Sequence, residues 1–189
     1  MEVTLRSLVT EMHGMLFGAF FLMTIFGVVV ELCRSALSMQ PSELTDRGYC
    51  VERVYLITMV VLGWAAVLSG SYIVYPWYRT VMPAGAVDLA NYPKYLLLSS
   101  PTTAGWHNMG MEWKEYIAWI APMAMTMVAY VLIKYKSSLK EHLQVRKAVF
   151  TFAVAAFVAV GIAGLFGAMI DKEAPVRGGA VIHITGQNR

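Results

Sequence analysis

Charged residues are scarce in this sequence. Asp, Glu, Lys and Arg make up 14% of its 189 residues, whereas a soluble domain carries roughly a quarter. Apolar residues reach 58%, and the mean hydropathy is +0.56. This composition excludes an ordinary soluble domain. In so apolar a chain the net charge of +3 is no sign of nucleic-acid binding, so we expect no nucleic-acid partner.

Ionisable side chains are missing from the interior of four long apolar runs. The runs are Met12–Val30, Val54–Tyr78, Tyr116–Ile133 and Ala148–Ile170. Acids and bases inside a membrane mark ion paths and proton relays, because they are costly to place there. Their absence disfavours a pump, a proton-coupled transporter or a charged pore.

Several enzyme signatures are absent as well. The sequence has no GxSxG, no HExxH, no phosphate-binding P-loop and no cluster of cysteine and histidine, so a stand-alone hydrolase or NTPase has no support. Its two cysteines, Cys33 and Cys50, do not form a CxxC pair. We therefore expect, at most, a non-autonomous subunit of an oxidoreductase complex.

The four apolar runs predict the fold. Each reaches the roughly 18–25 residues that span about 30 Å of hydrocarbon as a helix, and none alternates with the period of a membrane β-strand. We predict an all-α integral membrane protein, a four-transmembrane-helix bundle forming a single domain in a lipid bilayer. The expected helices are residues 12–32, 54–77, 115–135 and 148–170, with a long extramembrane loop at 78–114 and a tail at 171–189.

The distribution of basic residues predicts the orientation. Five of them crowd the short connection between the third and fourth helices: Lys134, Lys136, Lys140, Arg146 and Lys147. Basic residues in short loops near helix ends stay on the cytoplasmic side. We therefore expect a multi-pass protein of the inner (plasma) membrane, with both termini and the long loop on the periplasmic side.

Small residues and the tail each leave two interpretations open. Small-residue pairs and rows occur at Gly14 and Gly18, at Ala66 and Gly70, and at Gly161, Gly164 and Gly167. Such positions let helix backbones pack closely, or they form a notch for a flat cofactor. In the tail, the alternating stretch 180–185 either adds as a strand to a partner or is disordered.

Two histidines are the candidate cofactor ligands. His13 opens the first helix and His107 precedes the third, so both are expected at the outer face. A b-type haem needs two axial ligands on facing helices. If the third helix continues straight upstream, His107 lies roughly 13 Å above the hydrocarbon boundary. A shared haem b then requires Lys114 and its acidic neighbours to lie inside the bundle mouth, or the chain to fold back.

Aromatic residues and methionines add further candidates at the same face. Arg79 ends an aromatic cluster that closes the second helix, and it is a candidate partner for a haem propionate or a quinone. Met109 and Met111 follow His107, and with His13 they form a set of soft ligands suited to Cu(I). The candidate metal ligands are therefore His13, His107 and Met111, together with Met109.

These features favour a membrane subunit of a multi-subunit, respiratory-type electron-transfer complex. The layout resembles that of the membrane cytochrome b subunits of respiratory complexes. In this interpretation the subunit binds haem b and passes electrons between a membrane quinone and a periplasmic redox partner. The alternative is a non-catalytic structural or anchor subunit that docks other membrane or periplasmic subunits. Copper handling is a third possibility.

Overall fold

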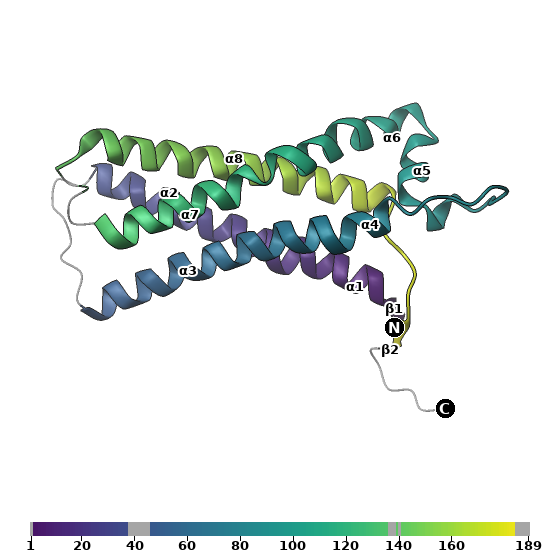
Figure 1. The fold of residues 1–189 in the computed structure, drawn as a ribbon, viewed down its shortest axis with the longest axis horizontal. Helices are drawn as coiled ribbons and strands as arrows, with labels where there is room; N and C mark the ends of the chain where they lie inside the picture. The colour runs from purple at the N-terminus through teal and green to yellow at the C-terminus, as the bar shows by residue number, and fades with distance from the viewer. Residues whose placement is uncertain (1, 38–45, 136–138, 140, 184–189) are drawn as a thin grey trace.

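Four long helices lie side by side in the computed structural model of this protein (Figure 1). The structure describes residues 2–37, 46–135, 139 and 141–183. Among these residues, four helical segments are long and apolar enough to cross a membrane: Leu5–Arg34, Arg47–Tyr78, Pro101–Tyr135 and Leu143–Glu173. Their length and composition make the chain a multi-pass, all-α membrane bundle, as the sequence predicts.

The first two segments are built from α-helix interrupted by π-helix. The first contains α1 (Leu5–Glu11), the π-helical η1 (Met12–Ala19) and α2 (Phe20–Leu37). The second contains α3 (Asp46–Ser69), the π-helical η2 (Gly70–Val74) and α4 (Tyr75–Tyr78). Thr4 caps α1, since its hydroxyl oxygen accepts the backbone N–H of Ser7 at 3.3 Å. The cap satisfies one of the amides that a helix start leaves unpaired.

The third segment begins earlier than the sequence predicts. It contains α6 (Pro101–Gly105), the π-helical η4 (Trp106–Met111) and η5 (Trp113–Ile117), and α7 (Ile120–Tyr135). Residues 101–114 are therefore helical and pack in the bundle, where we expected part of the loop 78–114. Pro101 favours this start because its missing N–H would be unpaired in the first turn anyway. The fourth segment, α8 (Leu143–Glu173), is α-helical throughout.

The two ends of the bundle differ (Figure 1). We call the end that carries both described chain termini the terminal end. There η3 (Leu89–Asn91) and α5 (Pro93–Leu98) join the second and third segments. The strand β1 (Glu2–Thr4) also pairs there antiparallel with β2 (Val181–His183). Part of the alternating tail thus pairs with the start of its own chain. At the opposite end α2 ends, α3 begins, α7 ends and α8 begins.

Alanine lines the extensive contact between α7 and α8. On α7 and α8, Ala121, Ala129, Ala153 and Ala156 are at most 4% exposed. Lipid offers no hydrophobic drive for helix association, so close van der Waals packing of small residues must provide it. Larger side chains fill the space between α2, α3 and α7: Phe21, Ile25, Met59 and Met125 are at most 2% exposed.

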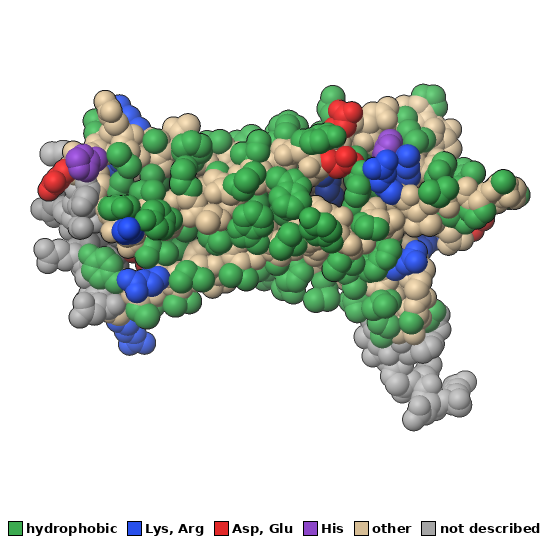
Figure 2. All heavy atoms as spheres, in the orientation of Figure 1, with side chains coloured by type: hydrophobic (Ala, Val, Ile, Leu, Met, Phe, Trp, Pro, Cys, Tyr) green, Lys and Arg blue, Asp and Glu red, His purple; other side chains and the backbone are tan. Residues whose placement is uncertain are grey.

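Apolar side chains cover the outside of the bundle between its two ends. Figure 2 shows them along the length of the helices, with most charged side chains gathered at the two ends. Met15, Met23, Val61 and Leu165 are each more than half exposed. An exposed apolar belt of this kind is the surface that a helix bundle presents to the acyl chains of a lipid bilayer.

The strand pairing leads to a cross-linking prediction. Val3 stands opposite Ile182, and paired residues have Cα atoms about 4.5–5.5 Å apart, within the range of a disulfide. In a background with Cys33 and Cys50 replaced by serine, Val3→Cys with Ile182→Cys should form a disulfide on mild oxidation. Counting free thiols by mass spectrometry after alkylation checks this. Val3→Cys with Val181→Cys is the out-of-register control, and equal cross-linking of both pairs would contradict the register.

Candidate functional site

Several polar side chains of the terminal end come from π-helical turns or lie next to them. His13 lies in η1, Ser69 directly precedes η2, and His107 and Lys114 lie in η4 and η5. A π-turn widens the helix and turns side chains out of the regular α-helical register, and such turns are frequent at functional sites. Three of the four segments carry them at the same end of the bundle, which locates the candidate site there.

His13 is held by the second helical segment. Its Nδ1 lies 3.0 Å from the Ser69 hydroxyl, which in turn donates to the backbone carbonyl of Ala66 at 3.2 Å. A hydroxyl has one proton, so Nδ1 donates to the Ser69 oxygen, and Nε2 of the neutral ring is left as an acceptor. The ring fits because residue 70 is glycine: a Cβ there would lie 2.7 Å from Cε1 of His13.

Lys114 is half-buried in the helical η5, where it packs against α8, and does not lie in a loop. A Cβ on Gly167 of α8 would lie 3.2 Å from the Lys114 amine, so the absence of a side chain on Gly167 makes room for it. Asp171, one turn further along α8, and His13 both lie close enough to Lys114 to interact with it electrostatically. We call His13, Ser69, Lys114 and Asp171 the inner cluster.

The sequence predicts no ionisable side chain at the depth of the four apolar runs, and Lys114 is an exception. Gly167 belongs to the apolar run Ala148–Ile170, so the lysine amine lies within the depth of that run, towards the terminal end. Its placement follows from the early start of the third segment, which brings residues 101–114 alongside α8. Lys114 is then close to Asp171, and a cation inside a membrane protein is usually paired with an acid in this way.

A second group of polar residues surrounds a pocket at the mouth of the bundle. The pocket has a volume of about 150 Å³, and we call it the mouth pocket. It is lined by Tyr75, Arg79, His107, Asn108, Met111, Glu112 and Glu115. The lining therefore contains two carboxylates, one guanidinium and one imidazole within a single small space.

Hydrogen bonds position the lining residues from one helix to the next. The Tyr75 hydroxyl donates to the carboxylate of Glu115, and Nη1 of Arg79 donates to the Tyr75 oxygen at 2.8 Å. The Arg79 guanidinium also lies over the Tyr75 ring, 5.3 Å from its centroid. These hydrogen bonds link the Arg79 guanidinium to the Glu115 carboxylate through the Tyr75 hydroxyl. They hold η5 against α4.

His107 is held at the same mouth by a buried tyrosine. Its Nδ1 lies 2.7 Å from the hydroxyl of Tyr78, and the two ring centroids are 5.8 Å apart. Tyr78 is only 3% exposed, which makes it a fixed support. Since one ring nitrogen is occupied by Tyr78, the other is the one available to a ligand.

The structure does not bring His13 and His107 together. They contact Ser69 and Tyr78, which are nine residues apart on one helical segment, or roughly 13 Å along its axis. Two axial ligands of one iron need their nitrogens about 4 Å apart, twice a metal–nitrogen bond of about 2 Å. Arg79, in contrast, lines the same pocket as His107.

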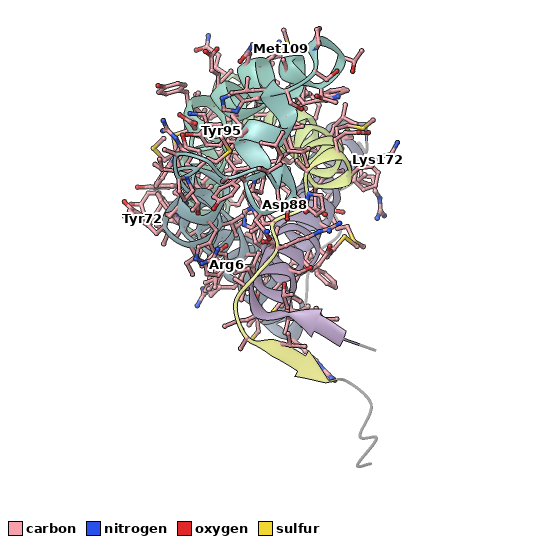
Figure 3. All side chains as sticks on the ribbon, turned by 90° about the vertical axis from the view of Figure 1, so that its right-hand side faces the viewer. Arg6, Tyr72, Asp88, Tyr95, Met109 and Lys172 are labelled. Atoms are coloured by element: carbon pink, nitrogen blue, oxygen red, sulfur yellow. The ribbon has the colours of Figure 1, made fainter. Side chains whose placement is uncertain are left out.

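The proposed copper ligands also point to different places. Met111 is 7% exposed and packs in a small apolar cluster with Tyr78, Leu97 and Ile170. Met109 is 66% exposed, and the end-on view places it at the edge of the bundle (Figure 3). Within the described residues, no group of three or more His, Cys, Asp or Glu side chains is placed to hold a metal ion.

Reasoning from the sequence missed most of the residues that now define the site. Ser69, Tyr75, Tyr78, Lys114, Glu115 and Asp171 were not among the expected site residues. The paired charges at Lys114 and Glu115, next to an apolar run, were the available signal. These charges entered the sequence analysis only as a condition for a shared haem, because residues 78–114 were assigned to a loop. No family model, no curated protein and no solved structure matches this chain.

Proposed function

We propose that this protein is a membrane subunit of an electron-transfer complex and that its mouth pocket binds the head group of a membrane quinone. The observation that carries the proposal is the pocket itself. A small space at the end of a lipid-facing bundle is lined by groups that can donate hydrogen bonds and groups that can accept protons. A quinone approaches from the lipid, and its polar head group stays near the membrane surface.

The size and chemistry of the pocket suit a single quinoid ring. A cavity of about 150 Å³ holds a benzene-sized molecule, and the open side of the pocket leaves room for ring substituents. The remaining N–H groups of Arg79 provide hydrogen-bond donors for a quinone carbonyl, and His107 provides a ring nitrogen for a quinol hydroxyl. The exposed apolar surface beside the pocket is where an isoprenoid tail would lie.

The same residues account for the protons of the reaction. Oxidation of a quinol to a quinone releases two protons and two electrons. His107 and Glu115 are the groups that accept the protons at the pocket. The electrons leave to a redox centre of a partner protein. With the basic connections of the opposite end on the cytoplasmic side, protons and electrons are delivered at the periplasmic side of the inner membrane.

The proposal does not depend on a haem shared by His13 and His107. Each histidine is already bonded to a different residue of the second segment, and their separation argues against one common iron. A haem b bound in the complex would need a ligand from another subunit. We therefore assign the electron acceptor to a partner protein. Docking of that partner by the bundle, which is the anchor function considered above, is part of the same proposal.

A binding experiment tests the quinone site. We expect a short-chain ubiquinone to bind saturably to the purified chain in phosphatidylcholine nanodiscs, detected by quenching of tryptophan fluorescence. Arg79→Gln should weaken binding about tenfold, since it removes a charge-assisted hydrogen bond worth roughly 1.4 kcal/mol. Lys172→Gln is the matched control, because Lys172 lies at the same end with its side chain 73% exposed.

Two results would overturn the proposal. Absence of saturable quinone binding by the wild-type chain would leave a purely structural subunit. Equal affinity of the wild-type chain and Arg79→Gln would place the ligand elsewhere. Unchanged binding by Lys172→Gln excludes a general effect of lost positive charge.

A further inference from the structure

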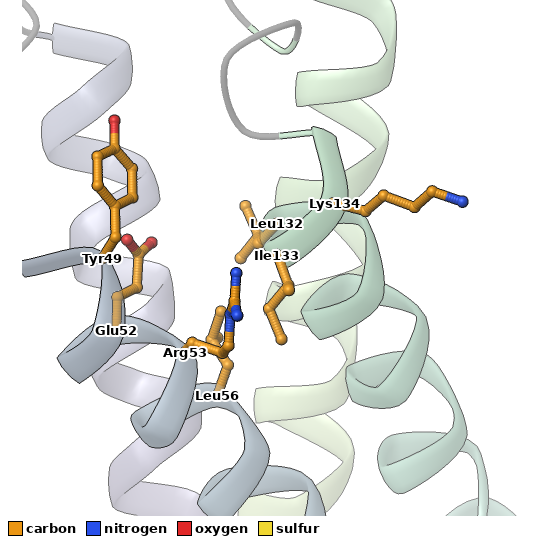
Figure 4. A pocket seen from close by; sticks show the side chains of 7 residues that line it. All are labelled: Tyr49, Glu52, Arg53, Leu56, Leu132, Ile133 and Lys134. Atoms are coloured by element: carbon orange, nitrogen blue, oxygen red, sulfur yellow. The ribbon is translucent and has the colours of Figure 1, made fainter. Parts of the chain in front are cut away.

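A second pocket lies at the opposite end of the bundle, far from the mouth pocket. It has a volume of about 240 Å³ and separates α3 from α7 (Figure 4). It is lined by Tyr49, Glu52, Arg53, Leu56, Leu132, Ile133 and Lys134. We call it the α3–α7 cleft. We infer that this cleft binds an anionic phospholipid, whose phosphate is held by Arg53.

The cleft is amphipathic in the way that a lipid site requires. Leu56 and Leu132, which are 2% and 8% exposed, form its apolar floor, together with Ile133. The polar lining residues Tyr49, Glu52 and Arg53 lie within little more than one turn of α3. A soluble anion would gain nothing from the apolar half of the lining. A phospholipid uses both halves, since its head group meets the polar side and its acyl chains meet the apolar side.

The depth of the cleft matches that of a lipid head group. Arg53 directly precedes the apolar run Val54–Tyr78, and Lys134 directly follows the run Tyr116–Ile133. Both cations therefore stand at the boundary of the hydrocarbon, on neighbouring helices. Basic pockets between transmembrane helices at this depth are suited to anionic lipid head groups.

Of the two cations that line the cleft, Arg53 is the one placed to contact the lipid phosphate. Figure 4 shows its side chain rising between the two helices beside Leu132 and Ile133. Among the residues that the structure describes, Arg53 has no ion-pair partner. Arginine presents a planar set of donors that matches a phosphate. Lys134 differs, because its amine donates to the Tyr130 hydroxyl at 2.9 Å and the side chain points away from the cleft.

The remaining charges at this end decide which lipid is preferred. Glu52 lies beside Tyr49, on the side of the cleft away from Ile133, whereas Arg53 extends towards Leu132 and Ile133 (Figure 4). At this end the described cations Arg34, Arg47, Arg53, Lys134, Arg146 and Lys147 outnumber the described acids Glu31, Asp46, Glu52 and Glu141, and Glu31 is paired with Arg34. The summed field of these charges favours an anionic lipid over a zwitterionic one.

The surface below the cleft continues its apolar floor. Ile57 and Val61 follow Arg53 at intervals of four residues, so they lie on the same face of α3. They are 51% and 59% exposed. An acyl chain that leaves the cleft along α3 therefore runs over apolar side chains that are open to the bilayer.

A lipid titration tests this site on the full chain. The protein is purified in detergent, stripped of lipid, and melted with increasing phosphatidylglycerol or with phosphatidylcholine. We expect phosphatidylglycerol to raise Tm at lower concentration than phosphatidylcholine. Arg53→Gln should raise the concentration needed about tenfold. Arg47→Gln, on the same helix but outside the cleft lining, should raise it far less, because it removes only a distant contribution to the field and no contact with the phosphate.

A second variant and a second ligand keep the test independent of folding effects. Ile133→Trp fills the cleft and should abolish the preference for phosphatidylglycerol, with size-exclusion chromatography confirming a folded chain. Inorganic phosphate should not raise Tm. The inference is overturned if Arg53→Gln and the wild-type chain respond equally to phosphatidylglycerol. It is also overturned if phosphatidylcholine or free phosphate stabilises the wild-type chain as well as phosphatidylglycerol.

Discussion

Replacing Gly63 by leucine is expected to destabilise the bundle by about 3 kcal/mol, because an overpacked core costs that much when its neighbours have little room. A Cβ at this position of α3 would lie 2.6 Å from Cζ of Phe21 and 2.7 Å from its Cε2. Phe21 is 2% exposed and is packed with Ile25 and Met59. The Phe21 ring can make room for the new side chain only if α2 and α3 move apart.

Thermal melting in detergent measures this effect. For a chain of this size, a loss of about 3 kcal/mol lowers Tm by roughly 6–12 °C. Gly161→Leu on α8 is the control, since a Cβ there would meet no atom within 4 Å. It should change stability by less than about 0.5 kcal/mol. An unchanged Tm for Gly63→Leu would contradict the contact with Phe21.

A double-mutant cycle separates this contact from a general effect of leucine. Phe21→Ala alone should cost about 3–5 kcal/mol, because it leaves a cavity. In the Gly63→Leu background the same change removes the clash, and the leucine fills part of the space. The two changes together should therefore cost at least about 1 kcal/mol less than their sum.

Replacing Lys114 by glutamate is expected to have an effect of similar size through charge. The new carboxylate would stand in the electrostatic range of Asp171, next to Glu115 in the sequence. Two charges about 10 Å apart interact by roughly 1.7 kcal/mol at an effective dielectric constant of about 20, so reversing the sign of one of them changes the pair energy by roughly 3 kcal/mol. An attraction between α8 and the third segment becomes a repulsion, and we expect the folded bundle to lose about that much.

Charge reversal at the partner distinguishes this cause from a packing defect. Asp171→Lys in the Lys114→Glu background restores the opposite signs and should recover most of the lost Tm. Lys172→Glu is the control, since it makes the same charge change on a side chain that is 73% exposed and should have little effect. If the double reversal is no more stable than Lys114→Glu alone, the electrostatic account of the inner cluster is wrong.

The glycines show where sequence patterns mislead. The small-residue spacing of Gly161 and Gly164 predicts helix contacts, yet a Cβ at either position would meet no atom within 4 Å. Two other glycines of the predicted patterns, Gly70 and Gly167, do make close contacts, and so do Gly27, Gly63 and Gly110, which the spacing did not single out. A glycine is needed where an aromatic or imidazole ring from another helix packs against the backbone, because a Cβ there would clash with the ring. The sequence of one helix contains no information about which ring that is.

The candidate site shows the same limit. His107 and Arg79 were expected at one membrane face, and the structure places both in the mouth pocket. His13 was grouped with His107 on the same basis, yet it bonds Ser69 roughly 13 Å further along the bundle. A membrane face can be assigned from topology. A shared ligand depends on helix rotation and register, which composition does not encode.

The sequence alone determined that the chain has four helices long and apolar enough to cross a bilayer, because apolar runs of about 20 residues have no other way to satisfy their backbone polar groups in lipid. Only the tertiary structure decided that residues 101–114 join the bundle, that Lys114 lies beside Gly167, and that Glu115, Tyr75 and Arg79 form one hydrogen-bonded chain. These features arise from π-turns and from the packing of helices far apart in the sequence. Hydrophobicity decides what enters the membrane, whereas contacts between helices decide which polar groups meet there.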